Sequence, residues 1–421
     1  MKIVPVVSAG SRGNSLDALA EAFVLMFRAS GYDAQLFNLN VPDDSTRLTS
    51  LLTSGNIAFV LGMAGLLSDL KLTRDDGTKA PAWAMLRIPH LSMLGDSPAY
   101  FFDRHVADSP ANALVYGFPD HLLLRKRLPF ADKTVLSVMP LAPLFTVPFE
   151  SLDFAKKREG KLLFLKNGND PEALRRNWRA TLAPGVSNAL MDLSELLTST
   201  DAIDQCHGTQ IDDAITEYYA AAGIEVQAIP KLRLLMNANL DDYARRIKST
   251  MIARTLMDFP VVVHGENWDY LDFSGKRCTF ISGSDYRASN QATRDALGLI
   301  DMSPNTTHAI HDRVTRAFGA YTYCLTNEHA FLDSLLPEQV GHMTFRFNPD
   351  SIAERVDRAL ANPMQTLEVG VAAAEIFRER FTDENFVNFI TLIADSVYQN
   401  IGNRPNNLQE FIVWPPATLA H

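Results

Sequence analysis

Short apolar runs alternate with stretches of helical periodicity through the first 135 residues, and this alternation constrains the fold more than any other feature. In residues 15–30, for example, apolar side chains recur at the spacing of one helix face. Strands that alternate with helices form crossover units, which make the strands of a sheet parallel. The predicted strands are residues 2–7, 34–37, 57–61, 90–94, 113–116 and 134–138.

A proline-rich and then charged stretch, residues 141–160, is typical of a linker between domains. A new strand, predicted at 161–166, starts a second α/β domain, and the pattern of residues 172–256 is mostly helical. An apolar helix face at 383–399 favours core packing over membrane binding, because the stretch lacks lysine and arginine. We predict an N-terminal domain over 1–140, a linker over 141–160, a C-terminal domain over 161–380, and a helix and tail over 381–421 that pack back across the domains.

Composition sets the broad class of the protein. A chain of 421 residues with 47% hydrophobic and 21% charged content is expected to form two globular domains. The net charge of −10 argues against a nucleic-acid partner. The three cysteines lie far apart, which indicates neither a zinc site nor a disulfide framework. No apolar run reaches the roughly 18 residues of a membrane span, and the N-terminus resembles a first strand, so we expect a soluble cytoplasmic protein.

Residues 303–328 carry the strongest functional signal in the sequence. A turn rich in proline, asparagine and threonine opens a helix predicted to begin near His308, with His311 and Arg313 in its first turns. A strand predicted at 321–325 then delivers Asn327 and Glu328. A helix N-terminus binds anions through its free amides and dipole, and a carboxylate beyond a neighbouring strand can bind ribose hydroxyls. These parts together predict a pocket for a nucleoside diphosphate.

Two alternatives apply to the same helix. Arg313 could form a structural ion pair, although an arginine one turn into an anion-binding helix favours phosphate. His308 and His311, with Asp312, could hold a metal, but no third sequence element offers matching ligands. The sequence has no Asp-x-Asp triplet either, and its adjacent aspartate pairs lie in helical stretches where neighbours diverge. We expect no metal and no other cofactor.

Further candidates for the same pocket follow other strands of the second domain. Gly265 would let the backbone approach a ligand and Trp268 could stack on a base, although a buried core tryptophan is an equal alternative. Tyr286 could line the same region, and the turn residues Gly168 and Asn169 complete the predicted set.

In the first domain, polar residues follow three predicted strands. The loop that contains Gly10, Arg12, Gly13 and Asn14 could bind an acceptor or a phosphate, or could simply be a tight turn that needs glycine. Asp96 and His121 follow two further strands, where α/β sheets hold their ligands. Either could take a proton from an acceptor hydroxyl, and a helix cap is the alternative role.

From residue 161 onward the order of elements resembles the C-terminal half of a GT-B glycosyltransferase, nearest to the spore-maturation-protein-like group of bacterial transferases. The resemblance is carried by LLFLKNGNDPEALRRNW, RTLMDFPVVVHGENW, SDYRASNQATRDALGLIDMSP and HDRVTRAFGAYTYCLTNEHAFLDSLLP. It implies two Rossmann-like α/β domains facing a cleft, with a helical segment in the second. The C-terminal domain would bind a nucleotide-sugar donor, and the N-terminal domain a glycan, lipid-linked or protein acceptor.

Two positions depart from the family pattern. The usual alanine-glycine pair before the strand reads Phe318-Gly319-Ala320. The retaining enzymes' two glutamates, eight positions apart, are not evident, because Ala320 lies eight positions before Glu328. The resemblance therefore implies an inverting, metal-independent transfer with Asp96 or His121 as base. Alternatives are a non-catalytic two-domain protein that binds a small ligand, and a GT-B-fold sugar epimerase or phosphorylase.

Overall fold

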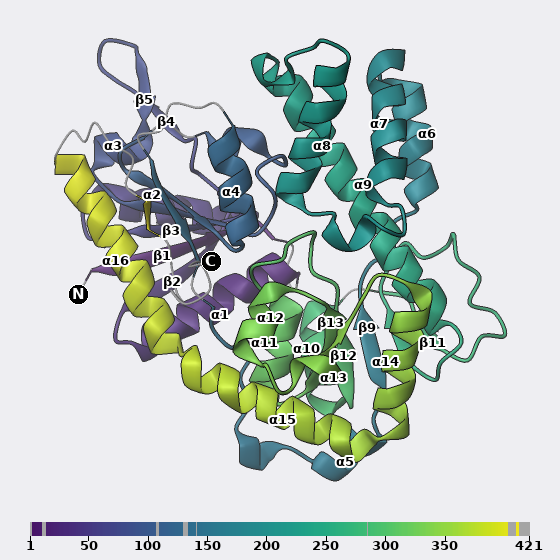
Figure 1. The fold of residues 1–421 in the computed structure, drawn as a ribbon. Helices are drawn as coiled ribbons and strands as arrows, with labels where there is room; N and C mark the ends of the chain where they lie inside the picture. The colour runs from purple at the N-terminus through teal and green to yellow at the C-terminus, as the bar shows by residue number, and fades with distance from the viewer. Residues whose placement is uncertain are drawn as a thin grey trace. The chain divides into compact units, whose positions relative to one another are not determined.

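The computed structural model describes residues 2–10, 14–106, 109–128, 134–139, 141–283, 285–402 and 410–411. The chain divides into two compact units (Figure 1). Unit 1 comprises Met1–Ala142 and Phe381–His421, and unit 2 comprises Pro143–Arg380. Each unit contains one parallel sheet with helices packed on it, the architecture that alternating strands and helices predict.

The sheet of unit 1 has the strand order β15-β8-β7-β6-β3-β1-β2, and all its pairs are parallel. Its strands are β1 (Ile3–Ser8), β2 (Asp33–Asn38), β3 (Val60–Met63), β6 (His90–Leu94), β7 (Asn112–Tyr116), β8 (Val135–Val138) and β15 (Glu410–Phe411). The helices are α1 (Ser15–Ala29), α2 (Pro42–Ser54), α3 (Ala82–Leu86), α4 (Pro119–Arg127) and α16 (Asp383–Gly402). A small antiparallel hairpin joins β4 (Lys71–Thr73) to β5 (Lys79–Pro81).

Helix α16 returns the chain to unit 1 after unit 2 is complete. It is the amphipathic helix predicted at 383–399, and it packs on α1 and on strands β6 to β8. The ring of Phe386 stacks on Phe23 with centroids 5.0 Å apart, and the Tyr32 and Thr391 hydroxyls lie 3.3 Å apart. The apolar face of this helix is therefore part of the core of unit 1.

The sheet of unit 2 has the order β11-β10-β9-β12-β13-β14, again all parallel. Its strands are β9 (Leu162–Leu165), β10 (Val262–His264), β11 (Thr279–Ile281), β12 (Gly298–Ile300), β13 (Tyr323–Asn327) and β14 (Thr344–Phe345). Its helices are α5 (Phe154–Glu159), α10 (Tyr286–Asp295), α11 (Asp312–Gly319), α12 (Ala330–Leu335), α13 (Val340–Met343), α14 (Pro349–Ala361) and α15 (Pro363–Arg380).

The helical segment predicted between β9 and β10 consists of four helices that share their own apolar core. They are α6 (Pro171–Thr181), α7 (Pro184–Leu197), α8 (Gly208–Ala221) and α9 (Pro230–Leu256) (Figure 1). Trp178, Leu190, Ile215 and Leu240 are buried at its centre.

Each predicted strand is present, with ends that differ by three residues or fewer. The helix predicted to begin near His308 starts only at Asp312, which corrects the prediction. The cause lies at Asn305, just before the predicted start of the helix, because its side chain bonds to α9. Asn305 is buried, donates to Asp241 Oδ1 (3.0 Å) and accepts from Lys248 Nζ (2.9 Å), so this stretch is fixed to α9. Residues 149–159, within the predicted linker, form a short 3-10 helix and α5 in unit 2.

A glycine sets how closely α15 approaches the sheet of unit 2. A Cβ at Gly370 would lie 2.5 Å from the Tyr323 backbone nitrogen at the start of β13. We expect Gly370→Ala to destabilise the protein by about 1–3 kcal/mol, because overpacking outweighs alanine's better helix propensity. Gly185→Ala in α7 is the control, since its Cβ would meet no atom within 4 Å. Chemical denaturation measures both, and equal stability of the two variants would contradict the close-packing argument.

Candidate functional site

Charged residues gather at the carboxyl edge of the sheet in unit 2. Lys166 directly follows β9, and Asp301 directly follows the adjacent strand β12. The backbone nitrogen of Lys166 donates to His264 O (3.0 Å), and that of Asp301 donates to Leu325 O (2.7 Å), so both positions extend the sheet. Parallel α/β sheets bind their ligands beyond this edge.

Asp301 is fully buried and binds the first turn of α11. Arg313 Nε donates to Asp301 Oδ1 at 2.6 Å, and Thr326 Oγ1 donates to Asp301 Oδ2 at 3.3 Å. His311 Nδ1 lies 3.7 Å from Asp301 Oδ1. Burial alone would raise the pKa of Asp301, but Arg313 and His311 outweigh it, so the pKa lies below its usual value. A charged carboxylate therefore holds the N-terminus of α11 against β12.

The start of α11 also binds α10. Asp312 Oδ1 lies 2.6 Å from His311 Nδ1, and Asp312 Oδ2 accepts from the Tyr286 hydroxyl at 2.8 Å. The Arg316 guanidinium stacks 4.5 Å above the Tyr286 ring. Tyr286 thus joins the first turns of the two helices, and its hydroxyl is engaged by Asp312.

Lys166 is the basic group of this edge whose charge is least compensated. Among the described residues, no carboxylate lies within ion-pair distance of it. Its burial, with repulsion from Arg313 and Arg245, lowers the pKa of Lys166 to about 7. Arg245 itself pairs with Asp241 at 3.0 Å. An anion bound here would stabilise the charged form of Lys166.

Trp268 lies in the core, the alternative that the sequence left open. Its side chain is 1% exposed, its ring stacks on Tyr270, and Nε1 donates to Lys166 O at 2.8 Å. A Cβ at Gly168 would overlap the Trp268 ring, and one at Gly265 would overlap Lys166 O. Both glycines make room for this packing, and a base cannot stack on a ring buried in this way. These residues position the Lys166 backbone.

The other predicted donor residues differ in accessibility. Asn169, His308 and Glu328 are exposed to solvent. Asn327 is the last residue of β13 and is 7% exposed. Its Oδ1 accepts from the Ser303 backbone nitrogen at 2.8 Å, so it fixes the segment before α11. Arg313 forms the structural ion pair named as its alternative role.

The predicted residues of unit 1 fall into two groups. Gly10 O accepts from Asn38 Nδ2 (2.9 Å), and Asn14 caps α1 by accepting from the Asp17 nitrogen (2.9 Å). Arg12 and Gly13 lie outside the described residues. Asp96 is exposed directly beyond β6, whereas His121 is 1% exposed in α4 against Phe118. Of the two predicted bases, Asp96 is the one that solvent and an acceptor can reach.

Lys166, Asp301 and Arg245 were not predicted from the sequence. The first two each follow a strand by one residue in the structure. Lys166 was the last residue of the strand predicted at 161–166, but no strand was predicted before Asp301, so only Lys166 had a weak signal in the sequence. Arg245 lies in the middle of a long helix, and nothing in its neighbourhood distinguishes it from surface arginines.

Two further observations concern the described part of the chain. Within it, no three His, Cys, Asp or Glu side chains are arranged to hold a metal ion. None of its helices combines the length and apolar character needed to cross a bilayer.

Comparison with known proteins shows similarity in part of the sequence and in the fold. Residues 245–391 match a sequence family described as glycosyl transferase-like. The fold is similar to that of sucrose-phosphate synthase from Thermosynechococcus elongatus, with a TM-score of 0.53 and 9% identity over 95% of this chain and 100% of that one. No curated protein matches the sequence. The two parallel-sheet domains have the GT-B fold, and residues 245–391 are similar to the glycosyl transferase-like family.

Two other solved structures were also found. One is Anabaena HepE in complex with UDP-glucose, with a TM-score of 0.49 and 9% identity over 95% of this chain and 100% of that one. The other is T4 phage BGT with its UDP-glucose substrate, with a TM-score of 0.48 and 8% identity over 94% of this chain and 100% of that one.

The Asp301–Arg313 pair should be essential for stability. Asp301→Asn leaves Arg313 buried beside a neutral group, which is expected to cost about 3–5 kcal/mol. Because the folded-state pKa of Asp301 is lowered, this stabilisation is present above about pH 4 and is lost as the pH falls further. The measurement is urea denaturation of both proteins from pH 7 to pH 3.

The control for this variant is Asp295→Asn, whose partner Lys156 is largely exposed. An exposed pair contributes about 0.2–1 kcal/mol, so this change should be small. If the two variants lose equal stability at pH 7, the buried pair does not hold α11 to the sheet.

Proposed function

We propose that the protein transfers a sugar from a nucleotide-activated donor to an acceptor hydroxyl, without a metal and with inversion at the anomeric carbon. The observation that carries this proposal is Lys166 at the carboxyl edge of unit 2, beside the N-terminus of α11, where no described carboxylate lies within ion-pair distance of its ammonium. A nucleotide sugar brings a diphosphate, the anion that such an edge binds. The neighbours solved with UDP-glucose suggest the same class of donor.

In this proposal the diphosphate lies against Lys166 and the first amides of α11. Arg313 contributes positive potential while it remains bound to Asp301. When the bond between sugar and diphosphate breaks, negative charge grows on the leaving phosphate. A fixed ammonium and helix amides stabilise that charge without reorganisation, the role that a metal plays in other transferases. Exposed Glu328, directly after β13, is the candidate partner of the ribose hydroxyls.

Asp96 is the proposed base for the acceptor, with unit 1 as the acceptor domain. Its carboxylate would take the proton of the acceptor hydroxyl as that oxygen attacks the anomeric carbon. Inversion is supported by Ala320, where the family resemblance would place the first glutamate of a retaining enzyme. The spore-maturation-like subgroup and the acceptor classes named from that resemblance are part of the same proposal.

Donor affinity should depend on the protonation of Lys166. With a pKa of about 7 in the free protein, the ammonium form predominates at pH 6 and the neutral form at pH 8. If only the charged form binds, affinity falls about tenfold across this range. The measurement is calorimetric titration with the tightest-binding member of a panel of nucleoside diphosphate sugars, with EDTA present throughout.

Lys166→Met should bind the same donor more weakly at pH 6 and show no such pH dependence. Lys231→Met is the control, because Lys231 is an exposed lysine of α9. A flat pH profile in the unmodified protein, or binding that EDTA abolishes, contradicts the proposed metal-free phosphate site.

The stereochemistry tests the reaction itself. Slow hydrolysis of the donor should release a sugar whose first-formed anomer is opposite to that in the donor, as proton NMR can record. Asp96→Asn should slow this step about 100-fold or more while donor affinity is unchanged. Asp69→Asn, another exposed aspartate of unit 1, should be neutral. A first product with the donor's own configuration would establish retention instead.

A further inference from the structure

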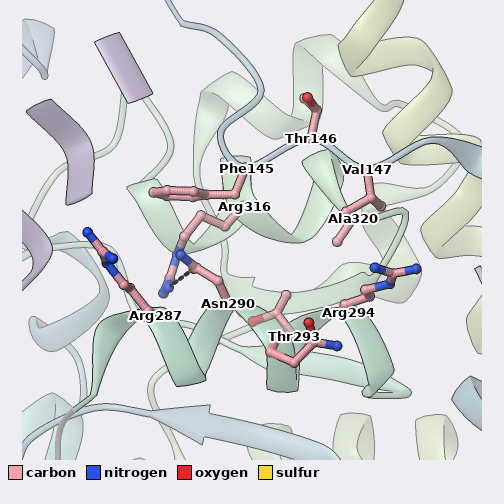
Figure 2. Close-up of a pocket in the computed structure, with 10 residues that line it drawn as sticks. Phe145, Thr146, Val147, Arg287, Asn290, Thr293, Arg294, Arg316 and Ala320 are labelled. Atoms are coloured by element: carbon pink, nitrogen blue, oxygen red, sulfur yellow. Dashed lines mark hydrogen bonds between the residues drawn. The ribbon is translucent and has the colours of Figure 1, made fainter. Parts of the chain in front are cut away.

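A pocket of about 290 Å³ lies within unit 2, between α10, α11 and the segment of residues 145–147 (Figure 2). One face of α10 supplies Arg287, Asn290, Gln291 and Arg294, α11 supplies Arg316, and Ala320 directly follows α11. The pocket is separate from the proposed donor site at the carboxyl edge of the sheet, since Lys166, His311 and Arg313 are not among its lining residues.

The charge of this pocket is opposite to that of the whole chain. Three of its described lining residues are arginines and none is acidic, whereas the protein has a net charge of −10. Like charges so close together repel, and a bound anion relieves that repulsion. Guanidinium groups also present paired donors that match the oxygens of phosphate.

Two of the arginines are held in place by hydrogen bonds to neutral partners. Arg316 is buried, and its Nη1 donates to Asn290 Oδ1 (2.7 Å) and Ser289 Oγ (3.1 Å), both neutral (Figure 2). Its contact with Asp312 is longer, 3.6 Å from Nε to Oδ2. Arg294 Nη2 donates to the Ser151 carbonyl at 2.6 Å. A ligand would therefore meet guanidinium groups that are already oriented, which lowers the entropic cost of binding.

The opposite wall is apolar and is fixed to α11. Phe145 and Val147 face the arginine-bearing helix across the pocket (Figure 2). The Val147 backbone nitrogen donates to Gly319 O at 3.1 Å, and a Cβ at Gly319 would overlap Leu144 O. The segment that contains Leu144 and Val147 thus lies so close to α11 that position 319 has room only for glycine. A cationic side facing an apolar side suits a ligand with one anionic and one carbon-rich end.

We propose that this pocket binds a small phosphate monoester, with the phosphate among Arg287, Arg294 and Arg316 and the organic part against Phe145 and Val147. A monoester carries close to two negative charges at pH 7, which suits three cations better than a single carboxylate does. The volume is at the lower end of that of small-molecule sites, so the ligand is a small metabolite rather than a nucleotide sugar.

Calorimetric titration with phenyl phosphate, inorganic phosphate and phenol tests the proposal. Phenyl phosphate should bind with a dissociation constant of about 1 mM or tighter, inorganic phosphate more weakly, and phenol not measurably. The double variant Arg287→Gln with Arg294→Gln should bind phenyl phosphate about tenfold more weakly or worse. Arg179→Gln, an exposed arginine of α6, is the matched control and should bind like the unmodified protein.

The variants also separate this pocket from the donor edge. Lys166→Met should bind phenyl phosphate normally, so a loss in that variant would place the anion at the donor site and overturn the proposal. Unchanged binding in the double variant, or no binding up to about 10 mM in the unmodified protein, would overturn it too. Equal affinity for inorganic phosphate would overturn the monoester assignment. If the double variant fails to fold, Arg287→Gln alone changes one exposed side chain and should still weaken binding.

Discussion

The buried ion pair between Asp301 and Arg313 is the interaction on which the functional edge of unit 2 depends. It joins the end of β12 to the first turn of α11, and so fixes where the amides of that helix point. An unpaired charge at either position would be costly in the core, so each residue constrains the other. Around the pair, Asn327 fixes residue 303, and Tyr286 ties α10 to Asp312. The edge is rigid before any ligand arrives.

Basic residues that pair with a carboxylate support the structure of this edge, whereas a basic residue without such a partner can bind a ligand. Arg313 and Arg245 each have a carboxylate partner, whereas no described carboxylate pairs with Lys166. Lys166 therefore carries the electrostatic part of the proposed donor site, and the arginines mainly hold the structure and raise the local potential. The same distinction separates the pocket on α10 from the rest of the surface, because its oriented guanidinium groups bind neutral partners such as Asn290 and Ser151. Preorganised positive charge is what anion binding and leaving-group stabilisation both require.

The sequence was sufficient to predict the two parallel sheets, because runs such as Ala113–Tyr116 are apolar throughout and match buried strands. It also indicated the region of the proposed donor site, since His311 and Arg313 lie at the start of α11. Prediction from the sequence failed where contacts between residues far apart in the chain determine the local structure. Asn305 bonds to α9 and delays the helix, Trp268 turns into the core, and Lys166 gains its importance only from a neighbouring strand 135 positions further along the chain. Local patterns contain no information about such partners.

The central claim is that a nucleotide sugar binds unit 2 through Lys166 and the N-terminus of α11. The most direct measurement is a crystal structure of the protein with its tightest-binding nucleotide sugar, grown with EDTA. The account predicts diphosphate oxygens within hydrogen-bond distance of Lys166 Nζ and the first amides of α11, with the Asp301–Arg313 pair intact. A diphosphate bound elsewhere in the protein, or one that reaches Arg313 only after the pair has broken, would contradict it.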